Sequence, residues 1–182
     1  MKGEKSNSAL ASFFHSSPFL AKLFSTTVEN VTSSTMTVEE VTGSHLFKIE
    51  RYSRVKKLNP KRQFIKSATF RVGGYDWYVQ FYPNGDGRAK DGHTSLFVNF
   101  NSTSGNVKAH MTVDFLDQNG KQLSDNLSRE AAVTFNCNHK SWGRSSFVRT
   151  SALESADLKN DCLVIECTVR VLKESVLKSS VL

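Results

Sequence analysis

Four side chains between residues 76 and 95 are of the types that carry out nucleophilic catalysis. His93 and Ser95 are close neighbours, and Asp91 and Asp76 stand near enough in the sequence to complete a serine–histidine–aspartate triad. Such common polar residues beside a turn carry little information by themselves. The sequence contains no glycine-rich phosphate loop, no HExxH zinc motif and no serine elbow between a strand and a helix. We therefore reject the triad and expect no catalytic residues and no enzymatic activity.

A second group combines cysteines with a histidine, the residue types that bind zinc. Cys137 and His139 could join Cys162 and Cys167, but the spacing matches no usual zinc motif, and the last two lie in or beside a strand-like alternation. We interpret the group as structural cysteines and a loop histidine, and expect neither a metal nor a cofactor. The three cysteines form no disulfide framework, which is typical of a reducing compartment and favours the nucleus or cytoplasm.

The chain is basic, with a formal net charge of +7 and a pI near 9.4. Its densest run of Lys and Arg covers residues 51–66, which around Asn59 and Pro60 is typical of a polar loop. Because no nucleic-acid recognition motif accompanies the charge, we expect a basic surface and no nucleic-acid partner. The charge instead indicates acidic or phosphorylated partners.

The first 42 residues differ in composition from the rest of the chain. Residues 1–27 hold short apolar patches broken by Ser and Pro, which excludes a signal-peptide core and a spanning helix, and we expect no membrane partner. Their Ser content resembles an organelle transit peptide, but they contain no Arg, so we prefer a disordered tail to organelle import. Residues 25–42 show no sustained periodicity of apolar residues and are interpreted as a linker. The predicted domain covers residues 43–172, followed by a C-terminal tail over residues 173–182.

The predicted domain is all-β, because short apolar stretches alternate with turn residues and no helical pattern is long enough for a crossover connection. Gly73 with Gly74, and Asn119 with Gly120, mark the clearest tight turns. Residues 151–158 can hold a helical turn before the last strand. Eight strands are predicted, over residues 46–51, 65–72, 75–82, 95–101, 107–115, 131–136, 142–149 and 163–171.

Period-two alternation assigns a face to each side chain of these strands. In the strand predicted over residues 95–101, Leu96, Val98 and Phe100 share one face, so Phe97 lies on the other. Core packing does not explain an aromatic residue there. The alternation therefore predicts that Phe97 is exposed on a sheet surface.

Four segments resemble a known domain family: GSHLFKIERYS (residues 43–53), IKSATFRVGGYDWYVQFYPNG (65–85), TSLFVNF (94–100) and SWGRSSFV (141–148). Their order and spacing, and above all the combination of VGGYDW, FYPNG and SWG, resemble a MATH (meprin and TRAF homology) domain. The sequence is similar to the N-terminal domain of plant BTB/POZ and MATH domain proteins and of speckle-type POZ protein, over about residues 43–172.

The resemblance implies an eight-stranded antiparallel TRAF-type β-sandwich whose shallow groove binds extended, Ser/Thr-rich degron peptides of substrate proteins. In this family a following BTB domain recruits cullin 3, which implies a substrate-recognition adaptor in protein ubiquitination. The chain ends about ten residues after its closing strand, too few for another domain, so we expect it to lack its own BTB domain. Three alternatives follow: a truncated paralogue, a competitor for substrates, or a subunit that acts through BTB/POZ–MATH proteins and, through them, cullin 3. The alternative is a structural or oligomerising TRAF-like protein with no ubiquitin role, although no heptad repeat precedes the domain.

The resemblance also implies a set of peptide-binding residues: Phe97, Met111, Val133, Ser141, Trp142, Gly143 and Arg144. Better-studied animal members carry aromatic residues in place of Met111, Val133 and Arg144, and an acidic residue in place of Ser141. The peptide specificity is therefore expected to differ or to be lost. Trp142 is either a core aromatic or a peptide contact, and Met111 is assigned to the core before the groove. Arg144 either pairs with a phosphate or carboxylate of a ligand or is a solvated charge.

Overall fold

The computed structural model describes residues 32–103, 105–123, 129–156, 158–173 and 178–181. Two units are described separately, Thr37–Val176 and the combination of Met1–Met36 with Leu177–Leu182. In the second unit, β1 (Thr32–Thr35) pairs with β11 (Lys178–Val181) as a two-stranded antiparallel sheet. The part of the predicted tail over residues 1–31 lies outside the described residues, whereas the predicted linker and C-terminal tail contain these two short strands.

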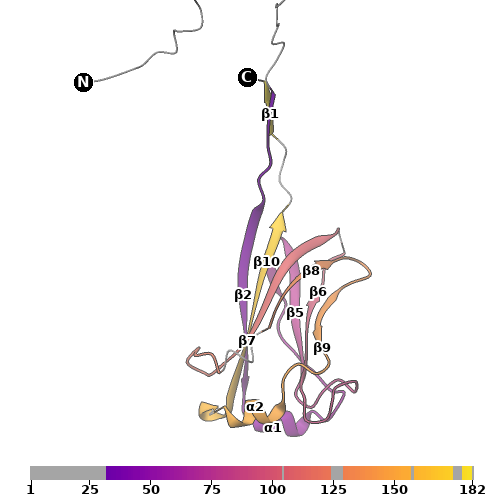
Figure 1. The fold of residues 1–182 in the computed structure, drawn as a ribbon. Coiled ribbons are helices and arrows are strands. Elements are labelled where there is room, and N and C mark those ends of the chain that lie inside the picture. Colours follow the sequence, from indigo (N-terminus) through magenta and orange to yellow (C-terminus); the bar gives the residue numbers. More distant parts are fainter. Residues whose placement is uncertain (1–31, 104, 124–128, 157, 174–177, 182) are drawn as a thin grey trace, which may run out of the picture. The chain divides into compact units, whose positions relative to one another are not determined.

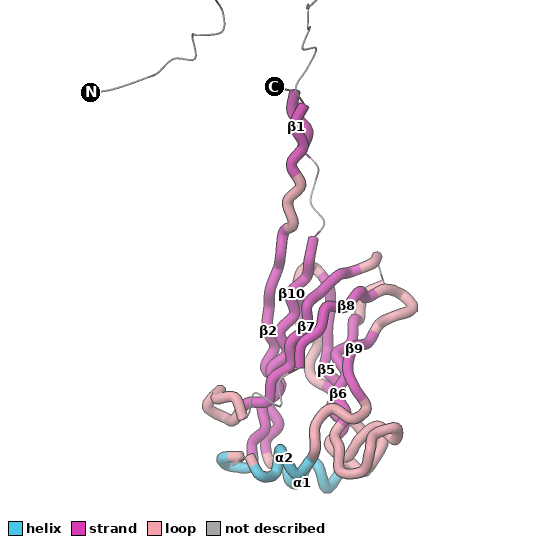
Figure 2. Tube along the Cα trace, in the orientation of Figure 1, coloured by secondary structure: helices cyan, strands magenta, loops and turns pink. Residues whose placement is uncertain are grey.

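The larger unit is a sandwich of two antiparallel sheets (Figure 1). One sheet has the order β2-β10-β7-β8, with β2 (Glu39–Glu50), β10 (Cys162–Lys173), β7 (Val107–Leu116) and β8 (Arg129–Phe135). The other has the order β3-β5-β6-β9, with β3 (Ile65–Lys66), β5 (Tyr75–Tyr82), β6 (Ser95–Phe100), β9 (Ser141–Arg144), and β4 (Phe70–Val72) paired to β5. Short helices lie at one end (Figure 2), namely α1 (Tyr52–Leu58), α2 (Thr150–Ser155) and the 3-10 turn η2 (Lys159–Asp161).

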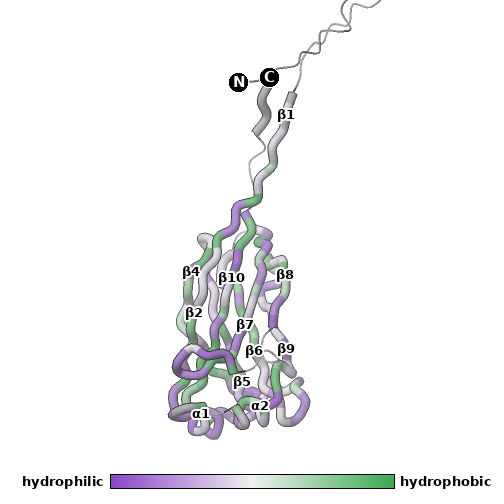
Figure 3. Tube along the Cα trace, turned by 60° about the vertical axis from the view of Figure 1, so that its left-hand side comes forward, coloured by the Kyte–Doolittle hydropathy of each residue, from purple (hydrophilic) through white to green (hydrophobic). Residues whose placement is uncertain are grey.

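Alternation of apolar and polar residues along the strands, visible in Figure 3, builds the core between the sheets. Trp77, Val79 and Phe81 of β5 are completely buried. The ring of Phe81 meets Phe115 of β7 with centroids 6.2 Å apart, and Trp77 meets Phe135 of β8 at 5.0 Å. Each fully buried side chain of this size stabilises the fold by about 1.5–3 kcal/mol, so these inward faces fix how the two sheets pack.

The prediction of an all-β antiparallel fold is confirmed, but the predicted number of eight strands is wrong, since the described residues form eleven. The sequence predicts neither β1 nor β11, and the stretch 65–72 divides into β3 and β4. The division has a local cause, because the N–H of Val79 donates to the hydroxyl oxygen of Ser67 (2.9 Å) in place of a strand carbonyl. β2 begins at Glu39, before the expected residue 46, and pairs with β10 along its whole length.

A helix stands where the sequence predicts a polar loop. Tyr52 and Val55 of α1 lie one turn apart, and both pack against the core, with Tyr52 only 2% exposed. The basic residues Arg54 and Lys57 stay exposed on the other side. This amphipathic pattern covers only seven residues, too few to stand out as a period. The helical turn predicted within residues 151–158 is confirmed by α2, and no described helix has the length and apolar composition needed to cross a membrane.

β9 is shorter than the strand predicted over residues 142–149. It ends at Arg144 because the next two residues bond to the loop before β6. The hydroxyl of Ser145 donates to the carboxylate of Asp86 (2.9 Å), and the hydroxyl oxygen of Ser146 accepts the N–H of Lys90 (2.9 Å). The five-stranded sheet therefore ends on a strand of only four residues.

Candidate functional site

Two edge strands lie on the same side of the larger unit. β9 is the last strand of the five-stranded sheet and β8 the last of the four-stranded sheet, and both lie on the right-hand side in Figures 1 and 2. Asn136 holds the turn between them, because its side-chain oxygen accepts the N–H groups of Asn138 and His139, both at 2.9 Å. Such an Asx turn reverses the chain tightly, so the end of β8 lies close to the start of β9.

One side of β9 has no strand partner in the described part of the chain. The N–H of Phe100 donates to the carbonyl of Lys140 (2.8 Å), where the ladder between β6 and β9 starts. Hydrogen-bonded and non-hydrogen-bonded pairs alternate in an antiparallel ladder, so from Trp142 onward every second residue turns its backbone groups to β6. Ser141 and Gly143 then turn their N–H and C=O groups to the free edge, where an added strand can pair with them.

Gly143 lies directly opposite Phe97 of β6. A Cβ on Gly143 would overlap the carbonyl oxygen of Leu96 and lie 2.7 Å from the Cα of Phe97, so only glycine allows this approach. Phe97 is half-buried on the outer face, where its ring meets Tyr82 edge-on with centroids 6.0 Å apart. Because Gly143 has no side chain, β9 does not cover the other side of this ring. Phe97 thus presents an aromatic surface beside the free edge.

Apolar side chains from both sheets line the inner face of this edge. Trp142 pairs with the buried Val98, so its indole turns toward the core, against which it packs half-buried. On the neighbouring edge, Val133 pairs with the buried Ala109 and is half-buried as well. We name Trp142 and Val133 the apolar rim. Met111 is completely buried and lies in the core, the position preferred for it over the groove.

The structure therefore brings most of the predicted peptide-binding residues together, on β6 and β9. Phe97 comes from β6, and β9 supplies Ser141, Trp142, Gly143 and Arg144. Val133 comes from β8 and packs against the same core as Trp142, whereas Met111 belongs to the core and cannot touch a ligand unless the core opens. Their role in binding stays a prediction.

Arg144 is the charged residue of β9. It is exposed and makes no hydrogen bond or ion pair with any described residue. The carboxylate of Asp86, close to the end of β9, is occupied by the hydroxyl of Ser145 and by the guanidinium of Arg88, each at 2.9 Å. Burial raises the pKa of Asp86, but hydrogen bonds from Arg88 and Ser145 outweigh it and hold the pKa below its usual value. Asp86 is thus ionised at neutral pH and already satisfied.

Asp86 and Ser145 were missed by the reasoning from sequence. The turn NGDG at residues 84–87 is a signal for a carboxylate that binds its own backbone, and Asp86 does accept the N–H groups of Arg88 (3.0 Å) and Ala89 (3.1 Å). Ser145, however, is distant in the sequence, and no local pattern links it to that turn. The pair anchors the C-terminal end of β9.

The residues of the rejected triad have other partners. Ser95 is completely buried, and its hydroxyl donates to the carbonyl of Ser145 while accepting the N–H of Asp86 (2.8 Å). Nδ1 of His93 lies 3.1 Å from the carbonyl oxygen of Asp91. Ser95 therefore supports the loop instead of facing a base. Within the described ranges, no group of three His, Cys, Asp or Glu side chains is placed to hold a metal ion.

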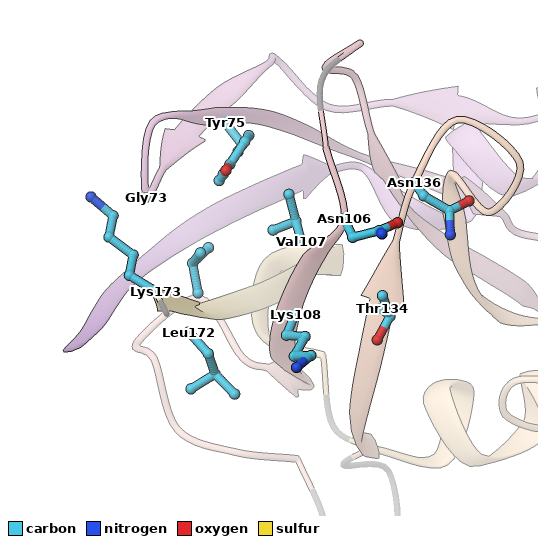
Figure 4. A pocket seen from close by; sticks show the side chains of 10 residues that line it. Gly73, Tyr75, Asn106, Val107, Lys108, Thr134, Asn136, Leu172 and Lys173 are labelled. Atoms are coloured by element: carbon cyan, nitrogen blue, oxygen red, sulfur yellow. The ribbon is translucent and has the colours of Figure 1, made fainter. Parts of the chain in front are cut away.

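A hollow of about 870 Å³ lies at the end of the larger unit where β7 begins and β10 ends (Figure 4). Its lining contains two asparagine amides, the hydroxyls of Tyr75 and Thr134 and two lysines, but no carboxylate, histidine or cysteine. The lining residues are Gly73, Tyr75, Asn106, Val107, Lys108, Thr134, Asn136, Val171, Leu172 and Lys173. It shares no residue with the free edge of β9 or the apolar rim.

Residues 44–169 match the MATH domain family, and the chain therefore belongs to this family. The family predicted from the motifs over residues 43–172 is confirmed. MATH domains are protein-interaction domains, so the fold and its open edge define an interaction module.

Similar proteins agree with this class. BTB/POZ and MATH domain-containing protein 3 of Arabidopsis thaliana is 39% identical over 148 residues, which cover 77% of this chain and 36% of that protein. BTB/POZ and MATH domain-containing protein 4 of the same plant is 34% identical over 142 residues, 74% of this chain and 30% of that protein. The chain thus spans about a third of the length of these relatives. Among solved structures, TRAF5 of Notothenia coriiceps matches with a TM-score of 0.52 at 18% identity, covering 70% of this chain and 72% of that one, a likeness of fold.

Proposed function

We propose that this MATH domain binds short extended peptides along the free edge of β9, as a substrate-recognition domain linked to a cullin 3 ubiquitin ligase. The observation that carries the proposal is the outward direction of the backbone groups of Ser141 and Gly143, next to the ring of Phe97. A peptide that adds a strand to a sheet edge gains affinity from main-chain hydrogen bonds and specificity from its alternate side chains.

The energetics of such an edge support the proposal. Each main-chain hydrogen bond to the added strand contributes about 0.5–1.5 kcal/mol net. Peptide side chains on the outer face would cover Phe97, and those on the inner face would cover Trp142 and Val133 of the apolar rim. Because burial of apolar surface contributes about 25 cal/mol per Å², these three side chains would supply much of the affinity.

The ligands we propose are Ser/Thr-rich degron peptides of substrate proteins, and the proposed link to the ligase is through relatives. The Arabidopsis relatives carry both BTB/POZ and MATH domains by name. The family resemblance implies that a BTB domain recruits cullin 3. We infer that this domain delivers its ligands to cullin 3 together with a BTB/POZ–MATH protein.

Fluorescence anisotropy with labelled Ser/Thr-rich peptides tests the binding step. We expect saturable binding that Phe97→Ala weakens about tenfold, since an aromatic contact contributes roughly 0.5–1.5 kcal/mol beyond its buried area. Leu58→Ala is the matched control, because Leu58 is 67% exposed on α1, away from β9. The proposal is wrong if no Ser/Thr-rich peptide binds, or if Phe97→Ala binds as the unchanged domain does.

Co-precipitation tests the ligase link. The tagged domain should recover a BTB/POZ–MATH protein and cullin 3 from plant extract, and failure to recover either would remove the ligase part of the proposal. Light scattering tests the alternative of an oligomerising TRAF-like protein, for which the mass would rise with concentration. A mass that stays that of a monomer at every concentration would exclude it.

A further inference from the structure

The side-chain directions along β9 divide a bound peptide into two sets of contacts. Trp142 and Arg144 pair with Val98 and Leu96, whose side chains are completely buried, so both turn to the inner face next to β8. A peptide strand paired with this edge alternates in the same way. Its residues opposite Trp142 and Arg144 are therefore two positions apart, and both project toward the inner face.

The two inner positions differ in chemistry. The residue opposite Trp142 meets the apolar rim formed with Val133. The residue two positions away lies directly opposite Arg144, and Cβ atoms in such cross-strand pairs are about 4.5–5.5 Å apart. That distance suits a guanidinium bound to a carboxylate or phosphate, since both present oxygens that match its planar fork.

The guanidinium of Arg144 is available for such a ligand. Among the described residues it has no hydrogen bond and no ion pair, whereas Arg71, Arg88 and Arg170 each pair with a carboxylate of the domain. The carboxylate near the end of β9, that of Asp86, is only 6% exposed and already bound. No acid of the described edge is placed to compete.

The carboxylate of the neighbouring edge strand points away from Arg144. Arg129 of β8 pairs with the buried Val113 and so turns to the inner face. Glu130 alternates with Arg129 along β8, so its carboxylate turns to the outer face. An anionic peptide side chain would thus be attracted, and a cationic one repelled.

Resting on the proposed function, we propose that this edge selects peptides with an anionic side chain, a carboxylate or a phosphate, two residues from an apolar one, and that Arg144 determines this selectivity. Arg144 contacts the anion, and Trp142 with Val133 contacts the apolar residue. This selectivity concerns the same site as the proposed peptide binding, but it is a separate claim about which peptide sequences bind.

Fluorescence anisotropy tests the proposal with one series of Ser/Thr-rich peptides that carry a central Val. Each peptide has Asp, phosphoserine, Ser or Lys two positions before or after the Val. At one of these positions, we expect an anionic peptide to bind roughly tenfold more tightly than the Ser peptide, within the range of charge-assisted hydrogen bonds. Equal gains for Asp and phosphoserine would support recognition of any carboxylate or phosphate, and a gain for phosphoserine alone would support recognition of phosphate.

Substitutions assign the effect to one side chain. Arg144→Gln should reduce the tenfold preference to less than about twofold, and Arg144→Glu should reverse it in favour of Lys. Arg54→Gln, on the exposed side of α1, removes the same charge far from β9 and should leave the preference unchanged. Lys140→Gln should also leave it unchanged at the Arg144 position, because Lys140 lies at the opposite end of β9.

The outcomes separate this inference from the proposed function. If no peptide of the series binds, the proposed function fails and the selectivity with it. If neutral and anionic peptides bind equally well, or if Arg144→Gln keeps the tenfold preference, the selectivity is wrong while peptide binding stands. Loss of the preference in Arg54→Gln would also overturn it, because net charge would then be the cause.

Discussion

Replacement of Gly143 by alanine tests how closely β9 approaches β6. The new methyl group would overlap the carbonyl oxygen of Leu96 and lie 2.7 Å from the Cα of Phe97 and 2.8 Å from the carbonyl carbon of Leu96. All three are backbone atoms, so no side-chain rotation can relieve the contact. β9 must therefore move away from β6, which weakens the ladder between them.

The size of the effect follows from two contributions. Overpacking that forces a backbone shift costs about 1–3 kcal/mol, and each weakened ladder hydrogen bond costs about 0.5–1.5 kcal/mol. We expect Gly143→Ala to lower the free energy of unfolding by about 2–4 kcal/mol, and the melting temperature by roughly 5–15 °C for a domain of this size. Peptide affinity should fall more than about tenfold, because the proposed ligand would pair with the backbone of the same strand.

Circular dichroism melting and fluorescence anisotropy measure the two effects together. Gly120→Ala is the control, because Gly120 has a φ of +79° and a Cβ there would meet no atom within 4 Å. This variant suffers only left-handed backbone strain, of about 1–2 kcal/mol, and should bind peptides as before. If Gly143→Ala binds peptides with unchanged affinity, β9 does not present its backbone as described, and the reasoning fails.

Three further predictions concern titratable groups. A thiol reagent should label Cys137 alone in the native protein, because Cys162 and Cys167 are buried and burial raises the pKa of Cys167 to about 12. Rapid labelling of a second thiol would contradict this prediction. Asp86→Asn should lower the free energy of unfolding at neutral pH by about 1–3 kcal/mol. In urea titrations, the difference in stability between the unchanged protein and this variant should shrink as the pH falls below 3.8, because the pKa of Asp86 in the folded protein lies below that ordinary value. His45, stacked on Phe70 at 4.6 Å, has its pKa lowered by burial, so its protonation destabilises the fold. Stability should therefore fall as the pH drops below 6.5, and His45→Phe should flatten that part of a melting-temperature profile.

Local alternation was enough to predict the strands with one buried face. β5 occupies residues 75–82 as predicted, with Trp77 and Phe81 inward, and β6 places Phe97 opposite the buried Leu96 and Val98. Side chains of both strands alternate between the inner and the outer face, although Ser95 and Asn99 on the outer face of β6 are buried as well. The period of two therefore determines the face of each residue. The face of Phe97 could be predicted for this reason, although its ring is half-buried where the alternation predicts exposure.

The remaining features depend on contacts between distant residues. The position of β9 at an edge follows from its pairing with β6, and its end follows from Ser145 binding to Asp86, neither of which leaves a local pattern. The burial of Met111 likewise depends on the strands packed around it. α1 escaped prediction because only Tyr52 and Val55 mark its apolar face, within a run of charges.

The brevity of β9 has a consequence for solubility. An exposed strand edge is a template on which further chains can stack into aggregates, and natural proteins protect such edges by keeping them short and charged. β9 has four residues, with Lys140 just before it and Arg144 at its end. An edge of four residues offers few backbone groups to an added strand, so it is a poor template for aggregation. The same shortness would limit the affinity of the domain for the proposed peptide ligands.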